Sequence, residues 1–445
     1  MINRIREHVT RWRHAGYSNV TPTTRRLLEY WADPERDNRV LFCQREAAET
    51  AIFAAEVAPR TGDVWIRNDL DTLNAQHNDG LNRVALKMAT GSGKTVVMAM
   101  LIAWQVLNKI ATPQSKTYTK RFLVVTPGLT IRDRLRVLLP SDPDNYFLLR
   151  DLVPPELRGG LGQAQIAITN YHTFLPRELA AARGVSRLTK DVLNPGGGPS
   201  PFTETDAQVV TRVLRDLGGS QELVVFNDEA HHCYRGRADE VKLAGADRTE
   251  ATERNEQARV WFSGVAAIKK AVGVKTVYDL SATPFFLRGS GYQEGTLFPW
   301  AVSDFSLTDA IESGIVKIPR MPVDDNQVSR TVTYLDLWSQ IRDELPKGGR
   351  RGQAPLDPTQ VPDVLETALR ALYGAYQRRF EEWEASAEAL TGATPPVFIV
   401  VCNNTSVSKW VFDWISASNM REDTRRCARS GIRSAGAVRL GVVGR

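Results

Sequence analysis

The residues Thr90-Gly91-Ser92-Gly93-Lys94-Thr95 form a glycine-rich turn that ends in a lysine and a threonine. Gly91 and Gly93 permit backbone torsions that a β-carbon would forbid, so successive N–H groups can point at phosphate oxygens. Lys94 can neutralise two neighbouring phosphates, and the Thr95 hydroxyl can bind Mg²⁺. These residue types in this order predict a site for a nucleoside triphosphate and its magnesium ion.

The segments on either side of the turn favour the same reading. Val84, Leu86 and Met88 alternate along the chain, as a strand requires. The following run, Val96–Trp104, is apolar on every side and predicts a buried helix whose positive end faces the turn. The alternative is a strand–turn–helix junction that binds nothing.

Four further apolar segments have the length of buried strands, and helical stretches separate them. They are Arg121–Pro127, Gln165–His172, Glu222–Glu229 and Lys275–Thr283. This alternation predicts an α/β fold, a doubly wound parallel sheet with its ligands at the carboxyl ends of the strands.

Acidic and hydroxyl side chains follow two of these strands. Asp228 can hold Mg²⁺ through water, and Glu229 can polarise an attacking water. Ser281 and Thr283 bring two hydroxyls to the same edge. Gln44 lies fifty residues before Lys94, and its amide could both donate to and accept from an adenine edge.

The composition, with 42% hydrophobic and 24% charged residues, is that of a globular protein without a membrane partner. No apolar run approaches the roughly 18 residues of a membrane span, and the charged start is no secretory signal. The four cysteines form no C-x-x-C pair, so we expect a cytoplasmic protein. His231, His232 and Cys233 lack the further ligands that zinc requires.

The net charge of +6 is concentrated at one end of the chain. Residues 421–445 contain seven arginines and two acidic residues, whereas the other residues contain 50 basic and 49 acidic groups. The bulk charge therefore indicates no partner.

The motifs together resemble those of superfamily-two DEAD/DEAH helicases, which implies a RecA-like ATPase lobe that uses ATP and Mg²⁺. Gln44 then matches the adenine-reading glutamine, and Asp228–His231 matches the DEAH box. By the same resemblance, Ser281–Thr283 and His231 would couple the nucleotide to the grip on nucleic acid. Contacts with nucleic acid would lie at the strand ends Thr126-Pro127 and Thr169-Asn170.

Four segments narrow the resemblance to the helicase-type Res subunits of type III restriction enzymes, over roughly residues 25–420. These are Ile168–Phe174, Asn227–His232, Leu280–Phe286, and Leu297–Trp300 through Lys317–Arg320. The resemblance implies double-stranded DNA as the substrate, ATP-driven translocation or switching, and a role in restriction or phage defence. It also implies a modification (methyltransferase) subunit as a partner.

The chain is predicted to have five parts. They are an N-terminal helical region with the Gln44 motif (1–60), the first RecA-like lobe (61–290), a connecting region with a long helix at Pro362–Leu390 (291–395), an incomplete start of a second lobe (396–420) and a disordered basic tail (421–445). The second lobe would begin with a strand at Val397–Cys402 and a helix at Ser406–Ser416.

The C-terminal region departs from the helicase pattern. The late motif Q-x-x-G-R-x-x-R is absent, and Arg429 and Arg433 match no such pattern. Only 29 residues follow Ser416, whereas completing a lobe takes roughly a hundred. We therefore expect a truncated chain that binds ATP weakly, hydrolyses it slowly and needs another chain to supply the rest of lobe 2.

Two other functions remain open. One is a nucleotide-dependent DNA-binding module without turnover of its own. The other is a non-motor P-loop ATPase such as a kinase-like enzyme, which the motifs at Asp228–His231 and Ser281–Thr283 disfavour.

Overall fold

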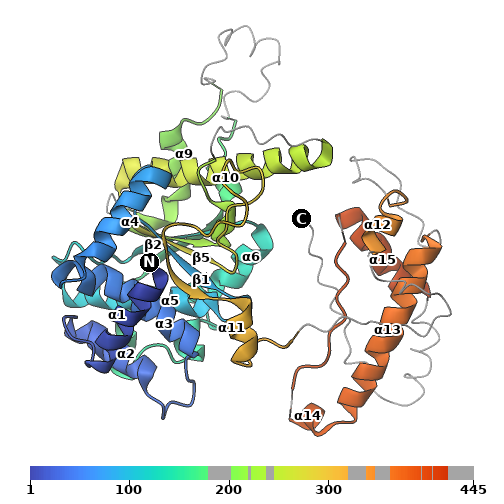
Figure 1. Ribbon diagram of the computed structural model, residues 1–445, viewed down its shortest axis with the longest axis horizontal. Helices are drawn as coiled ribbons and strands as arrows, with labels where there is room; N and C mark the ends of the chain where they lie inside the picture. The colour runs from blue at the N-terminus through green and yellow to red at the C-terminus, as the bar shows by residue number, and fades with distance from the viewer. Residues whose placement is uncertain are drawn as a thin grey trace. The chain divides into compact units, whose positions relative to one another are not determined.

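The computed structural model of the protein describes residues 1–178, 202–218, 222–236, 245–318, 337–345, 361–391, 393–402 and 404–418. The chain divides into two compact units, Met1–Ile318 and Pro319–Arg445 (Figure 1). The predicted basic tail, residues 421–445 with Arg429 and Arg433, lies outside the described residues.

A six-stranded sheet, with every strand pair parallel, forms the centre of the first unit, in the order β3-β2-β4-β5-β1-β6. The strands are β1 (Arg83–Met88), β2 (Arg121–Thr126), β3 (Gln165–Asn170), β4 (Leu223–Asp228), β5 (Val274–Ser281) and β6 (Ala301–Phe305). The predicted α/β fold with a parallel sheet is therefore confirmed. The sequence did not predict β6, which pairs with β1 at one edge.

The helices of this unit precede, connect and follow the strands. They are α1 (Ile2–His14), α2 (Pro22–Ala32), α3 (Phe42–Ile52), α4 (Val64–His77), α5 (Lys94–Ala111), α6 (Leu129–Arg134), α7 (Tyr146–Leu149), α9 (Asp206–Val213), α10 (Gly245–Val272) and α11 (Leu307–Glu312). Shorter 3-10 and π segments also occur in this unit, among them η5 (Tyr171–Phe174) after β3 and η8 (Ala230–His232) after β4.

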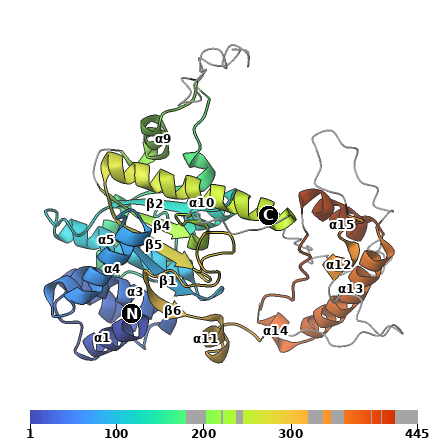
Figure 2. The ribbon, with the colours of Figure 1, turned by 45° about the horizontal axis from the view of Figure 1, so that its top comes forward.

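The two faces of the sheet are covered by different helices. Phe122 and Val124 of β2 belong to a core shared with α5 and the N-terminal helices, and α5 is buried along nearly its whole length. Leu123 and Val125, which alternate with them, belong to a second core formed with α9 and α10. Figure 2 shows α10 on one side of the strands and α3 on the other. Helices on both faces are typical of a parallel sheet.

Helix α5 is the one helix within the described ranges with the length and hydropathy of a membrane span. However, 72% of it is buried inside the protein, as expected of the core helix of a globular unit. The finding is therefore weak evidence for a membrane span.

A buried ion pair joins two strands of the sheet. Arg83 of β1 and Asp279 of β5 are 1% and 0% exposed, and Arg83 Nε lies 2.7 Å from Asp279 Oδ2. Trp300 Nε1 donates to the same carboxylate oxygen at 2.8 Å, and Asn227 Nδ2 donates to Oδ1 at 2.8 Å. The network thereby holds β1, β4 and β5 in register below the ends of the strands.

We expect Arg83→Met to destabilise the first unit by about 3–5 kcal/mol, because it leaves Asp279 as an uncompensated buried charge. The measurement is the free energy of unfolding in urea. Arg67→Met is the matched control, since Arg67 and Asp71 are 61% and 62% exposed, and we expect it to cost less than about 1 kcal/mol. Equal losses in the two variants would contradict a special role for the buried pair.

Four helices make up the described part of the second unit. They are α12 (Leu337–Ile341), α13 (Asp363–Glu384), α14 (Ala387–Leu390) and α15 (Thr405–Ser418). Leu365 and Leu369 of α13 pack in a core with Trp410 and Trp414 of α15. The helix predicted at Ser406–Ser416 is therefore confirmed.

The long helix predicted at Pro362–Leu390 is interrupted. Helix α13 ends at Glu384, where the Ser386 hydroxyl donates to the Trp383 carbonyl at 2.7 Å. A serine side chain that binds a nearby carbonyl competes with the helical backbone hydrogen bond, which accounts for the break before α14.

The strand predicted at Val397–Cys402 does not form. The segment alternates as a strand would, because Val397, Ile399 and Val401 are exposed while Phe398 stacks on Tyr376 at 5.7 Å. A strand also requires a neighbouring backbone to pair with, and the described residues of this unit contain no strand. The domain boundaries predicted at residues 60, 290 and 395 stay predictions.

Candidate active site

The carboxyl ends of the strands meet at one edge of the sheet. The register pairs Lys87 with Ser281 and Asp228 with Leu280, so the ends of β1, β5 and β4 are adjacent. Thr126 pairs with Asn170 further along the same edge. The structure therefore brings the predicted nucleotide residues to one part of this edge and the predicted DNA residues to another.

The glycine-rich turn connects β1 to α5 in a conformation that requires glycine at two positions. Gly91 and Gly93 have φ angles of +85° and +86°, in the left-handed region. The Ser92 side chain is fully buried and donates to the Ala89 carbonyl at 2.6 Å, so it shapes the turn. Thr90 and Gly91 are exposed. The turn thus places the first N–H groups of α5 at the sheet edge, where an anion can bind.

Gln44 packs directly on this turn from the first turn of α3. Its side chain is buried, Nε2 donates to the Ser92 carbonyl at 2.9 Å, and Oε1 accepts from the Leu41 N–H at 3.0 Å. A β-carbon at Gly93 would come well inside van der Waals contact with Nε2. The amide therefore holds the turn in place, and one of its N–H groups and one lone pair of its oxygen take no part in these two bonds.

Lys94 and Glu229 face each other at the strand ends. Lys94 Nζ lies 3.1 Å from Glu229 Oε1, and the two side chains are 12% and 29% exposed. Glu229 has a φ of +51°, a left-handed conformation that costs a non-glycine residue energy. Backbone strain of this kind concentrates at functional sites, and here it directs the carboxylate to the lysine of the turn.

Asp228, the last residue of β4, is only 7% exposed. Burial, and next the charge of Glu229, raises the pKa of its carboxyl to about 6. A buried carboxylate held in this way gains from a cation, and carboxylate and hydroxyl oxygens are ligands that Mg²⁺ accepts. Asp228 and the half-buried Thr95 in the first turn of α5 therefore fit a magnesium ion.

No group of three or more His, Cys, Asp or Glu able to hold a metal occurs among the residues that the structure describes. Magnesium does not need one, because it is usually bound by one or two protein oxygens together with substrate phosphates and water. The donor set at Asp228 is of that kind.

His231 connects the acidic pair to β5. Its Nδ1 lies 2.9 Å from Ser281 Oγ and 3.5 Å from Glu229 Oε2. Burial, and next the neighbouring His232, lowers the pKa of His231 to about 4, so the imidazole is neutral at pH 7. Ser281 Oγ also accepts from the Thr283 N–H at 3.1 Å. The Thr283 side chain is exposed, so only its backbone joins this chain of contacts.

Two of the four predicted DNA-contacting side chains are turned inward. Thr126 is fully buried and donates to the Gly128 carbonyl at 2.9 Å, and Asn170 is 6% exposed and accepts from the Thr173 hydroxyl at 3.1 Å. Both side chains serve their own turns, and the nucleic-acid contacts predicted for these two residues stay predictions. The half-buried Pro127 and Thr169 remain candidates for this contact.

Asn227 directly precedes the acidic pair, and the sequence interpretation gave its side chain no role of its own. It donates to Asp279, and its Oδ1 accepts from Trp261 Nε1 at 3.0 Å. The available signal was a polar residue within each of two apolar strands, Asn227 in β4 and Asp279 in β5. Such residues are buried and need partners, which here come from three separate elements.

Comparison with known families agrees with this geometry. Residues 43–286 match the family model described as Type III restriction enzyme, res subunit, and this range is more than half of the 445-residue chain. The chain belongs to this Res family. No curated protein matches it.

The matched range of the Res family contains β1 to β5 and every candidate residue from Gln44 to Thr283. It is narrower than the resemblance over roughly residues 25–420 that the sequence indicated. Membership supports a helicase-like, ATP-binding domain with a RecA-like arrangement of the sheet and its helices.

Proposed function

We propose that this Res-family chain provides the ATP-binding, Mg²⁺-dependent ATPase lobe of a DNA helicase or translocase in a type III restriction-like or phage-defence system. It would act in the cytoplasm on double-stranded DNA, together with a modification subunit. The observation that carries the proposal is the 3.1 Å pair between Lys94 of the turn and Glu229 beside Asp228. This pair brings a phosphate-binding cation and a candidate general base to one place.

Each residue at the edge then has a role. The N–H groups of Gly91 and Gly93 and the Lys94 ammonium bind the phosphates, while Thr95 and Asp228 hold Mg²⁺. When bound, the metal neutralises phosphate charge. Gln44 offers its remaining N–H and lone pair to the adenine edge.

The pairing of Lys94 with Glu229 supports an order of events. Lys94 turns toward the phosphates when they are bound, and this releases the Glu229 carboxylate. Glu229 can then accept a proton from the attacking water. Neutral His231 lies within contact distance of both Glu229 and the Ser281 hydroxyl, so a movement of Glu229 would be transmitted through His231 to Ser281.

The edge formed by β2 and β3 is the proposed DNA contact, at Pro127 and Thr169. Contacts of this kind reach the sugar–phosphate backbone, so binding should tolerate different sequences and weaken as salt rises. Salt-independent binding would contradict it.

The same ion pair favours a second candidate, a DNA-binding module without turnover, because Glu229 is occupied by Lys94 in this structure. ATP hydrolysis measured with and without duplex DNA separates the two. The main proposal predicts slow hydrolysis that duplex DNA raises. Nucleotide-dependent DNA binding without any hydrolysis would identify the module instead, and absence of both nucleotide and DNA binding would contradict both candidates.

We expect Gln44→Ala to lower the affinity for ATP more than the affinity for GTP, because the lost amide reads an adenine edge. The measurement is the ratio of the two dissociation constants. The affinity for both nucleotides should also fall by a common factor, because Gln44 donates a hydrogen bond to the Ser92 carbonyl of the turn. An ATP-to-GTP ratio identical to that of the wild type would refute base reading by Gln44.

A further inference from the structure

The η5 turn presents an exposed aromatic side chain beside the proposed DNA contact. It follows β3 directly, and its His172 is exposed. The His172 ring stacks on Tyr171, with 4.0 Å between the ring centroids. Tyr171 itself is buried, so the position of His172 depends on what Tyr171 packs against.

Helix α10 is the support beneath this turn. Tyr171 stacks on Trp261 with ring centroids 5.9 Å apart and an interplanar angle of 7°. One helical turn later, a β-carbon on Gly264 would come well inside van der Waals contact with the Phe174 ring. Glycine at position 264 therefore lets η5 lie directly on α10.

Trp261 also contacts β4 near its carboxyl end, next to the proposed nucleotide site. The side chain is fully buried, and its Nε1 donates to Asn227 Oδ1 at 3.0 Å. Asn227 immediately precedes Asp228, the proposed magnesium residue. One side chain thus contacts both the strand that holds Asp228 and the turn that presents His172.

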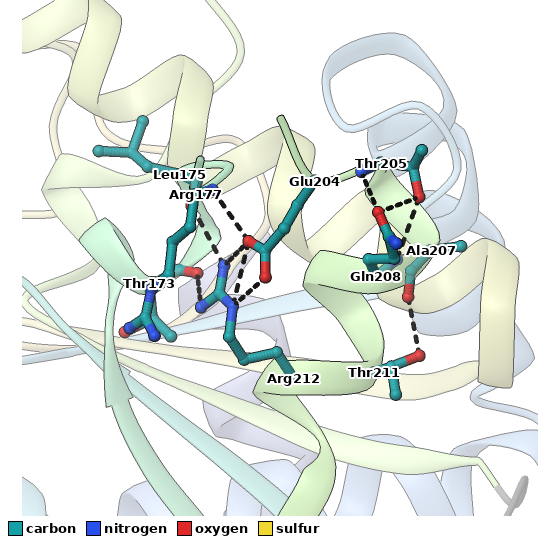
Figure 3. A network of polar contacts seen from close by, with 9 residues as sticks. All are labelled: Thr173, Leu175, Arg177, Glu204, Thr205, Ala207, Gln208, Thr211 and Arg212. Carbon is teal, nitrogen blue, oxygen red and sulfur yellow. Dashed lines mark hydrogen bonds and ion pairs between the residues drawn. The ribbon is translucent and has the colours of Figure 1, made fainter. Parts of the chain in front are cut away.

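The other end of η5 is held by α9, which shares a core with α10. Arg212 donates to the carbonyls of Thr173 and Leu175 at 2.9 and 3.2 Å, and it pairs with Glu204 at 2.7 Å (Figure 3). Glu204 also accepts from the Arg177 N–H at 2.9 Å. The hydrogen bond from Arg212 lowers the pKa of Glu204 to about 2, so the ion pair between these two residues stays charged at neutral pH. With this end fixed, a shift of Trp261 acts on the Tyr171 end.

We propose that Trp261 is a positioning residue that transmits occupancy of the nucleotide site to η5 and thereby adjusts the DNA contact near His172. The link runs from Asn227 through Trp261 to Tyr171. The DNA part of this inference rests on the proposed function, whereas the link between the nucleotide site and η5 does not. Coupling between two sites requires an element whose arrangement both sites influence, and Trp261 contacts Asn227 beside one site and Tyr171 beside the other.

Trp261→Phe tests the link, because it removes the indole N–H that binds Asn227 and keeps a ring for Tyr171. The readout is amide hydrogen exchange of residues 171–175, with and without a non-hydrolysable ATP analogue and Mg²⁺. In the wild type we expect the analogue to slow this exchange by about fivefold or more, the lower end of usual coupling factors. In the variant this effect should disappear, while the affinity for the analogue stays within about twofold.

Trp300→Phe is the matched control. Trp300 donates its indole N–H to Asp279 in the same buried network, and its ring contacts Arg83, His77, Phe286 and Phe298, none of which belongs to η5. The response of η5 to the analogue should therefore persist. If Trp261→Phe fails to fold, Tyr171→Leu replaces it, since that change removes the stack on Trp261 without touching Asn227.

The affinity for a fluorescent duplex DNA, measured with and without the analogue, provides the second arm. The analogue should change this affinity in the wild type and in Trp300→Phe, and in neither Trp261→Phe nor Tyr171→Leu. An η5 response that survives in Trp261→Phe, or is missing in the wild type, would overturn the link. A normal η5 response in a protein that binds no DNA would overturn the DNA contact and support the link alone.

Discussion

Replacing Lys94 by alanine is expected to weaken ATP binding by on the order of 100-fold, about 2.8 kcal/mol. The ammonium is the one side-chain cation that the turn contributes, and hydrogen bonds to charged groups are the strongest polar contacts in such a site. The change also leaves Glu229 without its 3.1 Å partner. The measurement is the dissociation constant for Mg·ATP by calorimetric titration.

Lys109→Ala is the control for this experiment. Lys109 lies in the last turn of the same helix, where its ammonium donates to the Ser115 carbonyl at 2.7 Å. We expect ATP affinity within about twofold of the wild type for this variant, since its charge is far along the helix from the turn. Unchanged ATP binding in Lys94→Ala would contradict the assignment of Lys94 as a phosphate-binding residue.

Glu229→Gln is expected to keep ATP binding and to lower hydrolysis by roughly 10²- to 10⁴-fold, the usual contribution of a general base. The amide cannot take up the proton of the attacking water. Binding should be unchanged or tighter, because a neutral amide competes less for Lys94 than the carboxylate does. Single-turnover hydrolysis and nucleotide affinity, measured on the same preparation, separate these two effects.

The matched control is Glu222→Gln, which makes the same change just before the opposite end of β4, where Glu222 pairs with Lys275 at 2.7 Å. Hydrolysis by this variant should stay near the wild-type rate. If Glu229→Gln hydrolyses ATP as fast as the wild type, the base lies elsewhere at the edge.

The sheet was largely predictable because its inner strands are short apolar runs that end in polar motifs. The runs that became β2 to β5 have no amphipathic alternation, so their length and their separation by helices decided the assignment, whereas β1 was predicted from the alternation of Val84, Leu86 and Met88. Strand β6 was not predicted because Ser303 and Asp304 interrupt its apolar residues at the edge of the sheet. The segment Val397–Cys402 shows the opposite error, since an apolar run alone does not supply a pairing partner.

Local order along the chain also indicated most of the candidate site. The turn at Gly91–Thr95 is one contiguous motif, and the pair Asp228-Glu229 is another. A parallel sheet brings the strand ends that carry them together. What the sequence could not indicate was which polar side chains face inward. Thr126 and Asn170, for example, hydrogen-bond within their own turns, which the sequence did not indicate.

Contacts between distant residues were beyond the reach of sequence patterns. Arg83 and Asp279 are 196 positions apart, and Trp261 and Asn227 are 34 apart. Nothing in the local sequence of α10 identifies its tryptophan as the partner of an asparagine in β4. These pairings follow from how the strands and α10 pack, which only the structure provides.

The central claim is that the edge formed by β1, β4 and β5 binds a magnesium nucleotide. The most direct test is an equilibrium titration of the wild-type chain with a fluorescent ATP analogue, in Mg²⁺ and in excess chelator. We predict saturable binding of one nucleotide per chain that unlabelled ATP displaces and that chelation of Mg²⁺ weakens. Absence of saturable binding, or binding of equal strength in Lys94→Ala, would contradict the account.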